Sequence, residues 1–117
     1  MAYVDSFVLA VPKADLDNFR VFTRKAGEVW REHGACAYVA CVGEDAPAGE
    51  LMTVPHAVPT SDDEVIVFSW IVYDSREHCE TVTAKALADP RLQGHGAGPW
   101  LDGRRLIEAA LHNRVQV

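Results

Sequence analysis

Four segments of the chain carry the two-residue alternation of apolar side chains that is typical of β-strands. They are residues 3–11, 35–44, 64–73 and 104–111. The segment 64–73 is apolar on both faces, with Ile66, Phe68, Trp70 and Val72 on one and Val65, Val67, Ile71 and Tyr73 on the other. Both faces of this strand must therefore be covered by other parts of the protein.

Two further segments have the three- and four-residue spacing of amphipathic helices. In the first, the apolar positions are Leu16, Phe19, Phe22, Ala26, Val29, Trp30 and His33. Gly34 suits the left-handed position that follows a helix. In the second, we expect Ser75 to be the N-cap and Asp89-Pro90 to follow the helix end. Its apolar stripe is Cys79, Val82, Thr83, Ala86 and Leu87.

The order strand, helix, strand, strand, helix, strand predicts an α+β, ferredoxin-like βαββαβ fold. In this fold a four-stranded antiparallel sheet carries both helices on one face. Two helices cover only one face, so we expect a second copy of the chain to cover the other. Packing two sheets in this way forms a homodimer of the kind called a dimeric α/β barrel. Residues 1–117 are expected to be one domain, with a long connection at 45–63 and a glycine-rich loop at 91–103.

Composition narrows the class of protein and its partners. The 117 residues are 49% hydrophobic and 24% charged, as in an ordinary globular domain. Seventeen acidic and eleven basic residues give a net charge of −6, which argues against nucleic acid as a partner. No apolar run is long enough to span a membrane, and the first residues lack the pattern of a signal peptide. We therefore expect a cytoplasmic protein with no membrane partner.

The cysteines and histidines show no metal-binding spacing. Cys36, Cys41 and Cys79 are odd in number, and Cys36 and Cys41 point to opposite faces of one strand. We expect the three thiols to be small buried hydrophobic groups. No two of the five histidines have a spacing that puts two ligands on one face. The pattern predicts no metal site, and the glycines of residues 94–98 lack the rest of a phosphate-binding motif, so we expect no cofactor.

Trp30, His33, Tyr38 and Trp70 form the candidate functional constellation. We predict a pocket at one end of the sheet, in which Trp30 and Trp70 stack on an apolar substrate. His33 and Tyr38 would orient its polar group or transfer a proton as catalytic residues. The alternative is that the tryptophans belong to the core and that His33 caps the carbonyls of its helix. Arg91 is the candidate ligand for a substrate carboxylate, or else it pairs with Asp74 or Asp89.

Several short segments, spread over nearly the whole chain, together match the pattern of a known protein family. They are YVDSFVL and VPK at residues 3–13, KAGEVWREHGA at 25–35, FSWIVY and SR at 68–76, DPRL at 89–92, and DGRR at 102–105. Together they resemble the YbaA-like family of small bacterial proteins. The resemblance implies a dimeric α/β-barrel fold and supplies no established catalytic residues.

Three functions are consistent with this combination of residues and resemblance. The wider superfamily includes cofactor-free monooxygenases, muconolactone-type isomerases and haem-binding relatives, so the first is a cofactor-free, monooxygenase- or isomerase-like enzyme acting on a small apolar acid or phenol. The second is a small-molecule-binding or stress-associated dimer without turnover. The third is a protein-interaction module that docks a partner through residues 45–63. A ligand-sized cavity lined by the four candidate residues would favour the enzyme.

Overall fold

A computed structural model of the chain describes residues 2–43, 63–92 and 107–112, with the backbone alone for 107–110. The elements in chain order are β1 (Tyr3–Pro12), the 3-10 turn η1 (Lys13–Asp15), α1 (Leu16–Glu32), β2 (Ala37–Val42), β3 (Glu64–Tyr73), α3 (Arg76–Leu87), the 3-10 turn η2 (Pro90–Leu92) and β4 (Ile107–His112). This order confirms the predicted βαββαβ arrangement.

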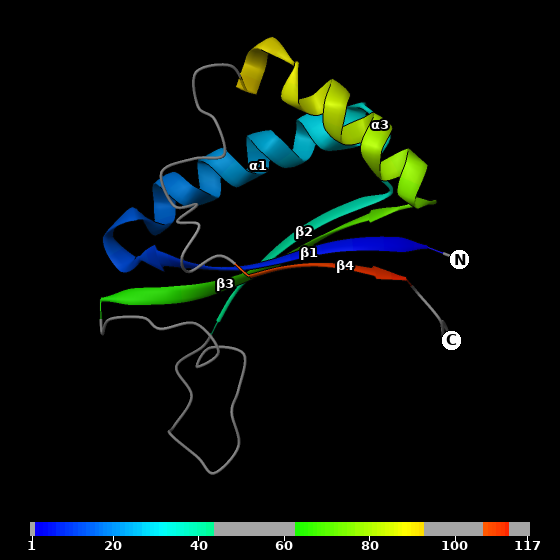
Figure 1. Cartoon of the computed structure of the whole chain (residues 1–117). Helices are drawn as coiled ribbons and strands as arrows, with labels where there is room; N and C mark the ends of the chain where they lie inside the picture. The colour runs from blue at the N-terminus through cyan, green and yellow to red at the C-terminus, as the bar shows by residue number, and fades with distance from the viewer. Residues whose placement is uncertain (1, 44–62, 93–106, 113–117) are drawn as a thin grey trace.

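The strands form one antiparallel sheet in the order β2-β3-β1-β4. Both helices lie on the same face of it (Figure 1). The α+β, ferredoxin-like fold expected from the sequence is therefore confirmed. Because β2 is an edge strand and α1 packs on it, the side of α1 next to β2 borders solvent as well as the sheet.

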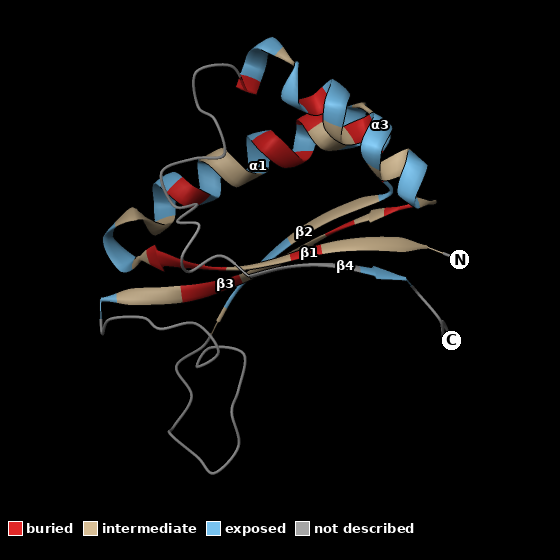
Figure 2. Cartoon of the chain, viewed as in Figure 1, coloured by how far each residue is buried: buried red, intermediate tan, exposed pale blue. Residues whose placement is uncertain are grey.

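The main core lies between the sheet and the two helices. The register pairs Leu9 with Val67 and Tyr3 with Tyr73, so odd-numbered residues of β1 and β3 face the helices. Figure 2 shows the buried residues on the strands and on both helices above them. The buried residues that these elements contribute are Leu9, Val11, Phe19, Ala26, Val29, Val67, Ile71, Tyr73, Val82 and Ala86.

The opposite face of the sheet is also apolar. Ala10 and Ile66 form a separate buried cluster there, with Val8 packed against it. The half-buried rings of Phe68 and Trp70 lie next to each other on this face, with centroids 5.7 Å apart. Neither of the two described helices covers it (Figure 1). We refer to it below as the helix-free face.

The helix ends agree with the sequence signals. Gly34 has φ of 118°, the left-handed conformation expected of a residue after a helix. Ser75 Oγ accepts a hydrogen bond from the backbone N–H of His78 at 3.1 Å, which confirms the N-cap of α3. Leu87 was placed in the apolar stripe of α3, but it is 56% exposed because it falls in the last turn.

Two predicted connections lie largely outside the described residues. Of the connection 45–63 only Asp63 is described, and of the loop 91–103 only Arg91 and Leu92, which belong to η2. The last strand was expected from residue 104, and the described strand begins at Ile107.

Candidate functional site

The predicted site residues occupy three separate places. Trp30 and Tyr38 lie between α1 and the sheet, with ring centroids 6.3 Å apart. His33 and Arg91 lie where α1 and α3 end. Trp70 points to the helix-free face, because its neighbour Ile71 points to the helices. The expectation that Trp30, His33, Tyr38 and Trp70 meet in one pocket is wrong, since the sheet separates Trp70 from the others and His33 bonds Asp89 at the helix ends.

Trp30 takes part in the core. Its Nε1–H donates a hydrogen bond to the hydroxyl of Tyr73 at 3.1 Å. Tyr73 is 1% exposed, and burial raises the pKa of its phenol above the usual range. The indole N–H therefore donates to a buried, neutral hydroxyl, which supports the alternative that Trp30 belongs to the core.

His33 and Arg91 belong to a polar cluster that joins the ends of the two helices. We call Glu32, His33, Asp89 and Arg91 the α1–α3 clamp. Asp89 accepts hydrogen bonds from the backbone N–H of Arg91 at 2.9 Å and from its Nε at 3.0 Å. Its other oxygen is 2.9 Å from both Nη2 of Arg91 and Nε2 of His33, and Nη2 also bonds Glu32.

The clamp identifies the partners of Arg91 and His33, the two residues for which the sequence left alternative roles open. Arg91 pairs with Asp89, one of the two acids named for it. The ring of His33 bonds a carboxylate of the other helix end, not the carbonyls of its own helix. Both side chains therefore have a structural partner across the α1–α3 contact.

The clamp is expected to make the protein sensitive to acid. Hydrogen bonds from Arg91, and then from His33, lower the pKa of Asp89. A carboxyl whose pKa is lowered by folding stabilises the fold above its ordinary pKa, and the stabilisation is lost as pH falls through the folded value. The melting temperature should therefore fall more steeply below about pH 4 in the wild type than in Asp89→Asn.

Thermal denaturation followed by circular dichroism between pH 7 and pH 2 measures this difference. At pH 7 we expect Asp89→Asn to melt several degrees below the wild type. The exposed Asp17→Asn serves as the control and should follow the wild-type curve. Parallel curves for the wild type and Asp89→Asn would contradict the role given to Asp89.

A groove of about 380 Å³ runs between α1 and the edge strand β2. Its α1 side is one helix face, since the residues recur at steps of three and four. The β2 side consists of the helix-facing positions Tyr38 and Ala40. The complete lining is Arg20, Thr23, Arg24, Gly27, Glu28, Arg31, Tyr38 and Ala40. We call it the α1–β2 groove.

Tyr38 forms the inner wall of this groove. A Cβ atom on Gly27 would come within 2.8 Å of Tyr38 Cδ1, so a glycine is needed there for the ring to lie against the helix. The hydroxyls of Tyr38 and Thr23 share a hydrogen bond at 3.2 Å. Burial raises the pKa of Tyr38, so its phenol is protonated at neutral pH and available as a donor.

The groove is positively charged in an acidic protein. Three arginines and one glutamate give its lining a formal charge of +2, whereas the chain carries −6. Arg24 pairs with Glu28 at 3.4 Å in an exposed ion pair. Nη1 of Arg31 donates to the carbonyls of Ala35, at 2.7 Å, and of Cys36. A small anion would find guanidinium groups and hydroxyls on the same surface.

Of the groove residues, the sequence singled out Tyr38 alone. The arginines lie between the apolar positions of the first helix, on its polar face, where charged residues usually contact solvent. Arg20, Arg24 and Arg31 share one face at steps of four and seven, which is the signal that could have found them. Their position beside Tyr38 depends on how α1 packs on β2.

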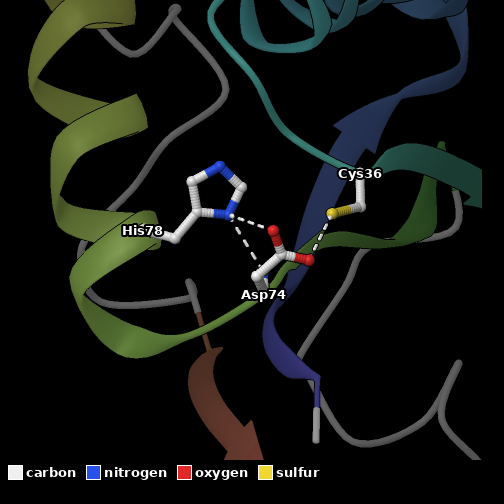
Figure 3. A group of neighbouring side chains, drawn as sticks. All are labelled: Cys36, Asp74 and His78. Carbon is white, nitrogen blue, oxygen red and sulfur yellow. Dashed lines mark hydrogen bonds and ion pairs between the residues drawn. The ribbon is translucent and has the colours of Figure 1, made fainter.

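A second cluster joins residues from three elements (Figure 3). Cys36 precedes β2, Asp74 follows β3 and His78 lies in the first turn of α3. One sulfur, oxygen or nitrogen atom from each lies within 4.8 Å of the others. Tertiary packing thus brings Cys36 and His78 together, a contact that their spacing along the sequence does not indicate.

The expected burial of the thiols is also wrong. Cys36 and Cys41 are exposed and Cys79 is partly buried, and all three are free. Cys36 lies in the turn before β2, and Cys41 lies on an edge strand, where neighbouring residues cover a side chain on one flank only. Partial desolvation and a hydrogen bond to Asp74 raise the pKa of the Cys36 thiol.

Comparison with known proteins places the chain in a family. A family model described as "Protein of unknown function (DUF1428)" matches residues 2–103. The "Uncharacterized protein YbaA" of Escherichia coli strain K12 is 38% identical over 107 residues, 92% of each chain. YbaA of Shigella flexneri matches with the same identity and coverage. These matches confirm the resemblance to the YbaA-like proteins.

A solved structure supports the fold. The de novo designed protein Foldit4 superposes with a TM-score of 0.50 and 14% identity, covering 97% of this chain and 100% of that chain. At this identity the likeness concerns the fold alone.

Among the described residues, no helix is long and apolar enough to cross a membrane. With a family model matching residues 2–103 and YbaA relatives 38% identical, the chain belongs to the DUF1428 family of proteins of unknown function.

Proposed function

We propose that this protein is a homodimer that binds a small organic acid in the α1–β2 groove. The observation that carries the proposal is the alignment of Arg20, Arg24 and Arg31 beside the hydroxyls of Thr23 and Tyr38. A carboxylate accepts paired hydrogen bonds from a guanidinium, and arginine suits this planar contact better than lysine. The volume of about 380 Å³ is within the range of small-molecule sites.

The ligand that fits this groove has one acidic group and a small apolar or phenolic body. The Tyr38 ring and the side chain of Ala40 offer an apolar wall on the β2 side. The Tyr38 hydroxyl can donate to a ligand oxygen, because its raised pKa keeps it protonated. Recognition therefore combines charge at the α1 side with an aromatic contact at the β2 side.

Binding without turnover is the favoured form of this function. Proton transfer by His33 together with Tyr38 was one expectation, but His33 bonds Asp89 in the clamp and is not among the groove residues. Because its pKa is raised by burial, the Tyr38 phenol stays protonated at neutral pH and offers no phenolate to act as a base. It remains a proton donor, however, so a cofactor-free enzyme with Tyr38 as its acid is the second candidate.

The homodimer is proposed to form through the helix-free face. Phe68, Trp70 and Val72 are partly buried on that face, although neither described helix covers it. A second copy of the sheet, related by a two-fold axis, would bury on the order of 800 Å² or more per subunit. The groove lies on the helix side of the sheet and would stay open in such a dimer.

The three cysteines carry free thiols, which are typical of proteins in a reducing compartment. We therefore propose that the protein is located in the cytoplasm.

Loss of the groove arginines should weaken ligand binding selectively. A screen of benzoates, hydroxybenzoates and other small organic acids by thermal shift identifies a ligand, because binding to the native state raises the melting temperature. Arg20→Ala and Arg24→Ala should each weaken its Kd roughly 10- to 100-fold, as expected for a lost hydrogen bond between charged groups. Tyr38→Phe should have a smaller effect. Isothermal titration calorimetry measures each Kd.

The control is Arg76→Ala, which removes an exposed arginine from α3 and should leave Kd unchanged. Ligand recovered after long incubation should be chemically unaltered by NMR. Turnover that depends on Tyr38 would instead support the enzyme. If no acid raises the melting temperature, or if the groove variants bind as the wild type does, the proposed function is wrong.

A further inference from the structure

The cluster of Cys36, Asp74 and His78 has the donor set of a transition-metal site. Cys36 Sγ lies 3.4 Å from Asp74 Oδ1, and His78 Nδ1 lies 3.8 Å from Asp74 Oδ2 (Figure 3). The side chains come from the turn before β2, the end of β3 and the start of α3, and they point toward one another. A thiol, a carboxylate and an imidazole thus meet at one point of the surface.

We propose that Cys36, Asp74 and His78 bind a divalent transition-metal ion of the zinc class. Zinc bonds sulfur at about 2.3 Å and nitrogen or oxygen at about 2.0–2.2 Å, so tetrahedral ligands lie about 3.4–3.6 Å apart. The two separations above are close to this spacing, and small side-chain rotations complete it. Three protein ligands leave one position open to solvent, as in zinc sites that also bind water or substrate.

The tautomer of His78 leaves a lone pair at the right nitrogen. The backbone N–H of Asp74 donates a hydrogen bond to Nδ1 at 2.9 Å, so Nδ1 is unprotonated and the ring proton is on Nε2. A metal ion at the cluster would take this lone pair in place of that one hydrogen bond. Neutral imidazole is the form of histidine that binds metals.

The surrounding structure holds two of the ligands in place. The rings of His78 and Tyr73 meet in a T-shaped arrangement with centroids 5.9 Å apart, and the Ser75 hydroxyl accepts a hydrogen bond from the backbone N–H of His78. On its other side, His78 Nε2 would lie 3.3 Å from a Cβ on Gly34, so the absence of a side chain there makes room for the ring. The backbone N–H of Cys36 donates a hydrogen bond to the carbonyl of Val72 at 2.8 Å, which holds the backbone of Cys36 in place. Asp74 is 82% exposed and free to adjust.

The donor set discriminates among metals. Thiolate and imidazole favour zinc, cobalt and copper over magnesium and calcium, which prefer oxygen ligands alone. This inference does not depend on the proposed function, because none of the three ligands lines the α1–β2 groove.

Cobalt provides a direct test, because a Co²⁺–thiolate bond has a charge-transfer absorption in the near ultraviolet. The full-length, reduced, metal-free protein is titrated with Co²⁺ and then with Zn²⁺ against a chromophoric chelator. We expect one ion per chain, a charge-transfer band with Co²⁺, and loss of that band when Zn²⁺ is added. Magnesium in excess should not displace either ion.

Single substitutions assign the ligands. Cys36→Ser should abolish the charge-transfer band, and Asp74→Asn and His78→Gln should each weaken Zn²⁺ binding by about 10- to 100-fold or more. The controls are Cys41→Ser, Glu77→Gln and His112→Gln, which change a cysteine, an acidic residue and a histidine elsewhere and should leave the affinity unchanged. Circular dichroism verifies folding. If His78→Gln is unstable, Asp74→Asn still tests the site, because Asp74 is exposed.

Three results would overturn the proposal. The first is the absence of Co²⁺ and Zn²⁺ binding by the wild type. The second is a charge-transfer band that survives Cys36→Ser. The third is unchanged affinity in both Asp74→Asn and His78→Gln, which would mean that an exposed thiol alone binds the metal.

Discussion

Ile71→Asp is expected to prevent folding, whereas Trp70→Asp is expected to yield a folded monomer. Ile71 is 5% exposed and packs in a cluster with Ala35, Tyr73 and Val82 between the sheet and the helices. A carboxylate there would be buried among apolar side chains at a cost of several kcal/mol. That cost is comparable with the whole free energy of unfolding of a small domain, about 5–15 kcal/mol.

Trp70 directly precedes Ile71 in the sequence and points to the helix-free face. If a second copy covers this face, a charge at Trp70 opposes association while the core on the other side of the sheet stays intact. Circular dichroism should therefore report native secondary structure for Trp70→Asp. Sedimentation at micromolar concentration should report the wild type at twice the chain mass of 12.9 kDa and Trp70→Asp at that mass alone.

Val21→Asp is the control for this pair of substitutions. Val21 is 72% exposed on α1, so a charge there should alter neither folding nor assembly. A wild type that sediments only as a 12.9 kDa monomer would refute the dimer. A Trp70→Asp variant that remains dimeric would show that the subunits meet elsewhere, for example along an edge strand.

Truncation of Tyr73 should have the second large effect. Tyr73→Ala removes one of the largest fully buried side chains and leaves the Trp30 N–H without its acceptor. Cavity formation at a buried aromatic position costs about 3–5 kcal/mol. Tyr73→Phe keeps the ring and removes only the hydroxyl, so it should cost about 1–3 kcal/mol through the unpaired indole N–H.

Urea denaturation of the wild type and both variants measures these free energies of unfolding. The ratio of the two losses in free energy of unfolding separates the contribution of packing from that of the hydrogen bond. Equal losses for Tyr73→Phe and Tyr73→Ala would mean that the hydrogen bond carries the whole effect. No loss in Tyr73→Phe would contradict the role given to the Trp30–Tyr73 bond.

The amino-acid sequence by itself determined the elements, their order and much of their detail. Apolar alternation located strands close to Tyr3–Pro12, Ala37–Val42 and Glu64–Tyr73, and helical spacing located α1. Gly34 and Ser75 marked helix ends because their conformational and capping preferences are local. The resemblance to the YbaA-like proteins was also visible in short segments, and the family match confirmed it.

Only the tertiary structure decided which residues meet. Both faces of β3 are apolar, so its pattern could not tell that Ile71 faces the helices and Trp70 faces away. The clamp joins Glu32 and His33 to residues more than fifty positions later, and the cluster of Cys36 with Asp74 spans 38 positions. Periodicity reports the environment within one element, whereas these contacts arise where separate elements end side by side. Their chemistry therefore depends on the packing of α1 and α3 on one sheet.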